Sequence, residues 1–174
     1  MATEPEVIRV SLVGPPKSGK TTLVARIVCK PLVQTISAPE SASSESESFA
    51  VKKVAITESL NVTFDICDIH GDPERFKARI MASDVIVVVF DLTSRKSYDV
   101  VTSIVQVIRS ANSRVKVVLV GNKCEMRLDR IIELVEVKIL AGDLDVPYIE
   151  ISAIQNIHVR EMLHLIALTA PRPL

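Results

Sequence analysis

Residues 14–21 of this chain read GPPKSGKT, which fits the pattern G-x-x-x-x-G-K-[ST]. An apolar run at 7–13 precedes this segment, and a helix-like stretch at 22–30 follows it. In a strand, a glycine-containing loop and a helix in this order, backbone N–H groups of the loop and of the helix N-terminus point at phosphate oxygens, and the helix dipole favours their negative charge. The segment therefore predicts a loop that cradles nucleotide phosphates.

The side chains of this loop have separate predicted roles. Lys20 is expected to reach the β- and γ-phosphates and is a candidate catalytic residue, and the Thr21 hydroxyl is expected to coordinate Mg²⁺. Further predicted nucleotide contacts come from Gly14, Lys17, Ser18, Gly19 and Thr22. Pro15 and Pro16 stiffen the loop and remove two N–H donors, while Lys17 adds a positive charge.

Composition limits the class of protein. The 174 residues are 48% hydrophobic, which suits one domain over 1–174 with a substantial core. Lysine plus arginine and aspartate plus glutamate each number 21, and this balance argues against nucleic acid as a partner. The start has no signal-peptide pattern, no apolar run reaches about 18 residues, and the three cysteines are scattered. We expect a cytoplasmic protein.

Strand-like and helix-like segments alternate along the chain. Strands are expected near 6–13, 49–57, 61–67, 84–90, 115–121 and 147–151, and helices near 20–30, 74–82, 94–112, 127–141 and 156–168. The closely spaced pair 49–57 and 61–67 predicts a hairpin with one antiparallel edge strand. The pattern predicts a three-layer α/β domain with a six-stranded, mostly parallel sheet.

Residues 37–48 are rich in Ser and Glu and contain no apolar residue larger than Ala. Such a segment buries too little surface to offset its ordering entropy, so we expect a mobile, switch-type loop beside the phosphate site. A surface linker without a role is the alternative.

A second motif follows the strand at 61–67. Asp68 and Gly71 form D-x-x-G about 50 residues after the phosphate loop. An Asp at this strand end would hold Mg²⁺ directly or through water, and the Gly71 N–H could approach a γ-phosphate without obstruction by a Cβ. An ordinary turn is the alternative, because the motif is short.

Two further motifs follow later strands. Residues 122–125 read NKCE, and Ser152 and Ala153 follow the last strand, at the edge where open α/β sheets bind ligands. Together with 74–76 (ERF) and 89–93 (VFDLT), the four motifs resemble the Ras superfamily of small GTPases, and within it the Rab-like branch. The resemblance covers nearly the whole chain.

The resemblance implies a phosphate-loop G domain that binds GTP or GDP with Mg²⁺. It implies a molecular switch in signalling or vesicle traffic, with effector, exchange-factor and GTPase-activating proteins as partners. Asn122 would brace the base and the phosphate loop, Lys123 would lay its stem over the guanine ring, and Ala153 would offer its N–H to guanine O6. Gly71, Glu125 and Ser152 complete the predicted nucleotide contacts.

Two departures from the family pattern bear on the chemistry. Glu125 stands where the family has Asp, so its longer side chain either pairs with guanine after a backbone adjustment or misses it. A missed contact costs about 1–3 kcal/mol, or about tenfold of discrimination. The water-positioning Gln is absent, and Asp72 and Pro73 stand there. Asp72 is the second candidate catalytic residue, but its charge faces a negative phosphate, so we expect slow hydrolysis.

Other departures concern switching and membrane attachment. Thr35 is the only Thr between Thr22 and Thr57, and it is the candidate switch ligand to Mg²⁺, with a serine of 37–48 as the alternative. If neither serves, the GTP and GDP states would differ little in shape. Residues 170–174 offer no Cys for prenylation, which predicts no direct lipid anchor in this chain and recruitment to membranes through partners.

Two other functions stay open at this point. A non-hydrolysing interaction module would keep nucleotide as a structural cofactor. A small nucleotide kinase fits less well, because the chain has the base-side motifs and lacks an Arg-rich lid. We expect Asp91 to be a solvated strand end and the three histidines to be structural.

Overall fold

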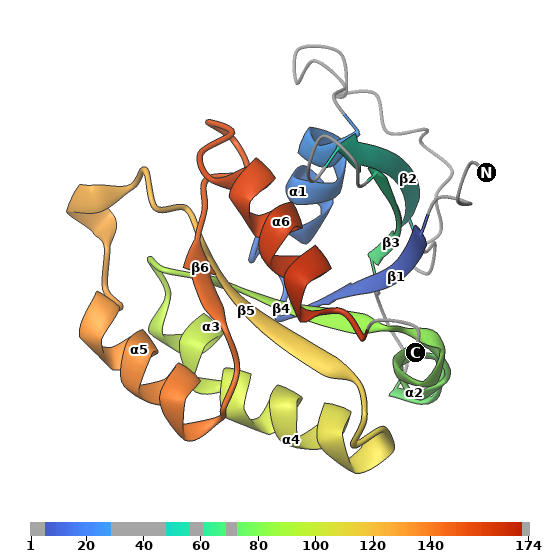
Figure 1. Ribbon diagram of the computed structural model, residues 1–174. Helices are drawn as coiled ribbons and strands as arrows, with labels where there is room; N and C mark the ends of the chain where they lie inside the picture. The colour runs from blue at the N-terminus through green and yellow to red at the C-terminus, as the bar shows by residue number, and fades with distance from the viewer. Residues whose placement is uncertain (1–5, 29–47, 56–60, 69–72, 172–174) are drawn as a thin grey trace, which may run out of the picture.

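The computed structural model describes residues 6–28, 48–55, 61–68 and 73–171 (Figure 1). The strands are β1 (Glu6–Val13), β2 (Ser48–Ala55), β3 (Asn61–Asp68), β4 (Val85–Asp91), β5 (Lys116–Asn122) and β6 (Tyr148–Glu150). The helices are α1 (Lys20–Ile27), α2 (Pro73–Ala82), α3 (Arg95–Asp99), α4 (Val101–Ala111), α5 (Leu134–Asp143) and α6 (Val159–Thr169). A 3₁₀ turn, η2 (Arg127–Asp129), precedes α5.

The six strands form one sheet in the order β2-β3-β1-β4-β5-β6. β2 runs antiparallel to β3, and every other neighbouring pair is parallel. The predicted six-stranded sheet and its antiparallel edge hairpin are therefore confirmed. The chain forms these strands because its apolar runs are rich in Val and Ile, which suit a sheet that is covered on both faces.

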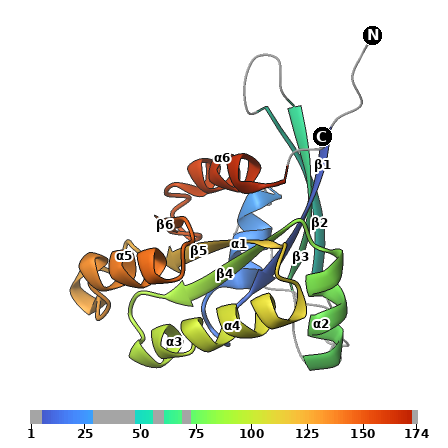
Figure 2. The ribbon, with the colours of Figure 1, turned by 60° about the horizontal axis from the view of Figure 1, so that its bottom comes forward.

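Helices cover both faces of the sheet and give three layers (Figures 1 and 2). α1 and α6 pack on one face, while α2, α4 and α5 pack on the other. Successive residues of β4 point to opposite faces of the sheet. Val85, Val87 and Val89 face α1 and α6. Ile86, Val88 and Phe90 face the other layer of helices. All seven residues of β4 are buried, as expected for a central strand.

Several predicted helices have different bounds in the structure, and the one expected at 20–30 ends at Ile27. The helix expected at 94–112 is divided at Val100 into α3 and α4. The helix expected at 127–141 was wrong at its start, because α5 begins only at Leu134. There the Glu136 carboxylate accepts the Glu133 N–H at 3.1 Å, which satisfies a donor at the helix start. The helix expected at 156–168 begins at Val159.

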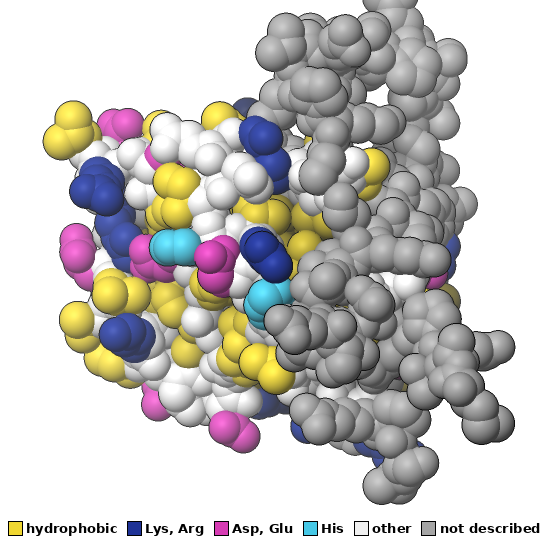
Figure 3. Space-filling model, turned by 45° about the horizontal axis from the view of Figure 1, so that its top comes forward, with side chains coloured by type: hydrophobic (Ala, Val, Ile, Leu, Met, Phe, Trp, Pro, Cys, Tyr) yellow, Lys and Arg dark blue, Asp and Glu magenta, His cyan; other side chains and the backbone are white. Residues whose placement is uncertain are grey.

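The surface is mixed in charge. On the face in Figure 3, Lys and Arg side chains alternate with Asp and Glu side chains and do not gather into a patch of one sign. Within the described ranges, no helix combines the length and apolar character needed to cross a bilayer.

The topology brings the predicted motifs together. β1, β3, β4 and β5 are parallel, so the segments that follow them leave the sheet at one edge. This edge carries the loop after β1 and the residues after β4, β5 and β6, which come from distant parts of the sequence (Figure 1).

We predict that truncation of the β4 core destabilises the domain. Ile86 is 0% exposed, so Ile86→Ala should lower the free energy of unfolding by about 2–5 kcal/mol through lost burial and a residual cavity. Val7 on β1 is 56% exposed, and Val7→Ala should cost less than about 1 kcal/mol. Urea unfolding of both variants measures the difference, and equal losses would contradict the assigned core.

Candidate nucleotide-binding site

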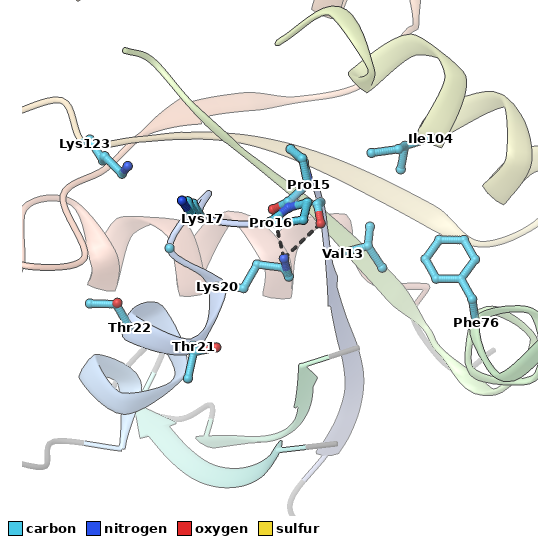
Figure 4. Close-up of a pocket in the computed structure, with 12 residues that line it drawn as sticks. Val13, Pro15, Pro16, Lys17, Lys20, Thr21, Thr22, Phe76, Ile104 and Lys123 are labelled. Atoms are coloured by element: carbon cyan, nitrogen blue, oxygen red, sulfur yellow. Dashed lines mark hydrogen bonds between the residues drawn. The ribbon is translucent and has the colours of Figure 1, made fainter. Parts of the chain in front are cut away.

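A cavity of about 760 Å³ opens at the carboxyl edge of the sheet (Figure 4). It is lined by one run of residues from the predicted phosphate loop and by three side chains from other elements. The lining residues are Val13, Gly14, Pro15, Pro16, Lys17, Gly19, Lys20, Thr21, Thr22, Phe76, Ile104 and Lys123. The structure therefore places the predicted phosphate-loop residues around one concave space, with Ser18 buried beneath them.

Two glycines of this loop are required by the protein itself. Gly14 has φ +148°, and a Cβ there would lie 2.0 Å from the carbonyl oxygen of Val89 on β4. Gly19 has φ +92°, and a Cβ there would lie 2.2 Å from Nδ2 of Asn122. The absence of side chains lets the loop sit directly against β4 and against the residue that ends β5.

Lys20 holds a buried cation at the cavity wall. Its side chain is on the first turn of α1, and its Nζ donates to the carbonyl oxygens of Gly14 at 2.9 Å and Pro15 at 3.1 Å. Burial lowers the pKa of Lys20, and the negative charge of Asp68 opposes that shift. A polyphosphate in the cavity would bring the negative charge that a buried ammonium favours.

Thr21 and Asp68 form a pair of oxygen donors. The Thr21 Oγ1 donates to Asp68 Oδ2 at 2.8 Å, which joins the start of α1 to the end of β3. A hydroxyl and a carboxylate fit Mg²⁺, which takes oxygen ligands and completes its shell with water and phosphate. Nowhere in the described ranges do three or more His, Cys, Asp or Glu side chains gather as a metal site.

The Ser18 hydroxyl lies outside the lining of the cavity. It is fully buried beneath the loop, and its Oγ has no hydrogen-bond partner within the described part of the chain. Buried hydroxyls are normally satisfied by protein or water, so this Oγ is an exception within the described residues.

The Asn122 amide joins three loops. Its Nδ2 donates to the Ser18 carbonyl oxygen at 2.9 Å, and its Oδ1 accepts the N–H of Ala153 at 3.1 Å. Asn122 therefore joins the phosphate loop to the segment after β6, and its predicted contact with the base stays a prediction. The N–H of Ala153, predicted to face guanine O6, is donated to Asn122 in this structure. Ser152 is fully buried beside it, and its Oγ accepts the Gln155 N–H.

Asp91 is not a solvated strand end, and that expectation was wrong. It is 7% exposed and forms an ion pair with Lys123, with Oδ2 2.5 Å from Nζ. Thr93 donates both its N–H and its hydroxyl to the other carboxylate oxygen. Burial raises the pKa of Asp91, but the hydrogen bonds from Lys123 and Thr93 outweigh burial and hold the pKa below its ordinary value. The carboxylate thereby anchors Lys123, whose stem lines the cavity.

Glu125 lines a second hollow, of about 720 Å³, which shares no lining residue with the cavity at the phosphate loop. Its Oε2 is buried and has no hydrogen-bond partner among the residues that the structure describes. Whether this carboxylate pairs with guanine stays a prediction.

Two arginines that the sequence analysis did not single out contact β6 and the segment after it. Arg26 on α1 donates from Nε to the Ala153 carbonyl oxygen at 2.9 Å and from a second nitrogen to that of Ile154. Arg130 forms two hydrogen bonds with the Glu150 carboxylate, at 2.7 and 2.8 Å. Arg26 and Ala153 are 127 positions apart, so no local spacing could have indicated this contact.

Some predicted site residues lie outside the described residues: Thr35, Gly71, Asp72 and the part 37–47 of the predicted switch-type loop. Their roles stay predictions.

Comparisons with known proteins agree with this geometry. A family model described as the Ras family matches residues 9–171. GTP-binding protein YPTM1 of Zea mays is 26% identical over 160 residues, which cover 89% of this chain and 74% of the relative. GTP-binding protein YPT1 of Saccharomyces cerevisiae is 32% identical over 118 residues, which cover 65% of this chain and 56% of the relative.

A third relative is matched over only a small part of its own length. Circularly permutated Ras protein 1 of Dictyostelium discoideum is 32% identical over 116 residues, which cover 64% of this chain and 14% of the relative. The chain thus spans a small part of that protein and little more than half of YPT1.

We predict opposite effects for alanine at two glycines. Gly14→Ala should lower the free energy of unfolding by about 2–5 kcal/mol, because the new Cβ meets the Val89 carbonyl and the positive φ is strained. Gly142 lies in α5, and a Cβ there meets nothing within 4 Å, so Gly142→Ala should raise stability by about 0.5–1 kcal/mol. Denaturant unfolding tests both, and a neutral Gly14→Ala would contradict the loop geometry.

A second prediction concerns pH. Because the folded pKa of Asp91 is depressed, its carboxylate stabilises the fold above the ordinary carboxyl pKa of about 4, and this contribution is lost as pH falls through the folded value. Asp91→Asn should therefore cost about 1–2 kcal/mol at pH 7 and progressively less below about pH 4. Urea unfolding over this pH range measures the difference, with the exposed Asp143→Asn variant as control. A deficit independent of pH would contradict a role for the charge.

Proposed function

This chain belongs to the Ras family, is a small GTPase of the Rab-like kind, and from that premise we propose that it binds GTP and GDP with Mg²⁺ and acts as a slow molecular switch. The observation that carries this proposal is the Asn122 amide, which joins the phosphate loop to the base-side segment at Ala153. A simple phosphate-binding protein needs no such link, whereas a nucleotide presents a phosphate end and a base end to one site.

The proposed chemistry is phosphoryl transfer to water. Catalysis in this class consists of positioning and charge stabilisation, which the protein provides with fixed cations and dipoles. Lys20 would hold the β- and γ-phosphates, and Mg²⁺ on Thr21, with Asp68 behind it, would supply positive charge as the leaving oxygen becomes negative. The burial of Lys20 supports this role, because a cation is worth more in a dry site than in water.

Slow hydrolysis is the finer part of the proposal. Asp72 stands in the place of the water-positioning Gln and Pro73 begins α2 with no N–H to offer. We therefore propose that a GTPase-activating partner supplies what is missing, an effect that reaches about 10³–10⁵ in rate for known cases.

Guanine preference is proposed on the base-side residues. Lys123 would lie against the ring with its ammonium anchored by Asp91, Asn122 and Ser152 would hold the loop, and Glu125 would accept from the guanine N1 and N2 groups. Exchange factors and effectors are further proposed partners, in signalling or vesicle traffic. A cytoplasmic location with recruitment to membranes through partners is proposed on the same family resemblance.

We predict that nucleotide titration separates this function from its alternative. Nucleotide-free protein should bind GTP and GDP with Mg²⁺ and reject ATP by calorimetry. Lys20→Ala should weaken binding by at least about tenfold, because a charge-assisted contact contributes about 1.5–3 kcal/mol. The exposed Lys138→Gln variant removes an equal charge far from the cavity and is the control.

Turnover is measured on the same samples. Phosphate release from GTP above the Lys20→Ala level would support a slow GTPase. Guanine binding without such release would support the non-hydrolysing interaction module. Equal affinity for ATP, or no affinity for any of the three nucleotides, would refute the proposed function.

A further inference from the structure

The phosphate loop contains a lysine, Lys17, whose backbone conformation is unfavourable for a residue with a Cβ. Lys17 has φ +65°, in the left-handed region that residues with a Cβ rarely adopt. It lies in the turn 15–18, which the Ser18 N–H closes on the Pro15 carbonyl oxygen at 3.4 Å. A Pro at the second position and a positive φ at the third are typical of a type II turn, where Gly is the favoured third residue.

Nothing in the protein accounts for a lysine at this position. The side chain is exposed, and no hydrogen bond or ion pair joins it to any residue within the described ranges. Backbone strain that no packing contact requires tends to occur at functional sites. The Lys17 side chain is therefore available to a group outside the protein.

The Lys17 residue is part of the cavity wall. Lys17 lines it together with Lys20 and Lys123, and Figure 4 shows Lys17 on the side of the loop toward Lys123, away from Phe76 and Ile104. Asp91 neutralises Lys123, and the charge of Asp68 acts on Lys20. Lys20 also donates to two carbonyl oxygens, so Lys17 is the one of these three cations with no partner among the described residues.

The neighbouring prolines explain why an added cation would be useful. Pro15 and Pro16 have no N–H, so this loop has two fewer backbone donors to direct at phosphate oxygens. An ammonium at the next position can replace lost dipoles with a full charge, and it has three donors that rotate freely.

We propose that the Lys17 side chain is a second phosphate-binding cation, which contacts the polyphosphate of a bound nucleotide from the base side of the loop. This inference rests on the proposed nucleotide binding and adds a side-chain role to a position that the motif leaves unspecified. Because Lys17 lies toward Lys123 rather than toward Phe76 and Ile104, it should strengthen diphosphate and triphosphate binding alike.

The test uses the full chain with Mg²⁺ and GDP or GTP. Lys17→Gln keeps the length and removes the charge, and Lys17→Asn removes the charge with a residue that accepts positive φ. We expect both to weaken GDP and GTP binding by about fivefold to tenfold and to reduce the salt dependence of the affinity. Lys17→Arg should restore most of the binding, and Lys138→Gln is the matched loss of an exposed lysine. Thermal unfolding checks that each variant folds.

The outcomes separate this inference from the proposed function. If the wild-type chain binds GDP and Lys17→Gln binds it equally well, the inference fails and the proposed function stands. If Lys17→Asn binds as tightly as wild type or tighter, Lys17 is merely a strained turn residue, and the inference again fails. If the wild-type chain binds neither nucleotide, the proposed function fails and this inference fails with it.

Discussion

The Asn122 side chain is the interaction on which the arrangement of the site depends. It is 3% exposed, and it offers one donor and one acceptor to two backbone groups from opposite ends of the chain. A buried amide left without either partner would cost about 1–3 kcal/mol, so the two hydrogen bonds fix the distance between the phosphate loop and the segment after β6. Gly19 completes the contact, because only a residue without Cβ leaves room for the amide.

Charge compensation is the second constraint at this edge of the sheet. Three lysines line one cavity, and two of them feel carboxylates at strand ends: Asp91, the last residue of β4, pairs with Lys123, and the charge of Asp68, the last residue of β3, acts on Lys20. Unpaired cations repel one another and lose solvation when buried, so these carboxylates offset part of the cost of placing cations at this edge. The sheet topology makes this possible, because parallel strands deliver their last residues to one place.

Much of this could be predicted from the sequence, and the failures have a common cause. The strands were predictable because their apolar runs are long, and the phosphate loop because its pattern is local. Asp91 was misjudged because a strand end with a charge looks solvated, whereas its partner Lys123 lies 32 positions away. The start of α5 was misplaced because the hydrogen bond at its N-terminus joins two glutamates, Glu133 and Glu136. The usual N-cap residues Ser, Thr, Asp and Asn are absent there. Arg26 was missed because its contacts exist only after the chain has folded.

Most polar groups at the site already have partners within the protein, so ligand binding would exchange existing hydrogen bonds for new ones. A guanine that takes the N–H of Ala153 exchanges the Asn122 oxygen for a new acceptor, whereas Mg²⁺ can bind the Thr21 oxygen while the Thr21 hydroxyl still donates to Asp68. Each exchange gains only the difference between the new and old contacts. The Lys17 ammonium, which has no partner among the described residues and belongs to a residue that lines the cavity, would gain a contact without losing one. Net affinity should therefore depend more on Lys17 than a count of contacts would suggest.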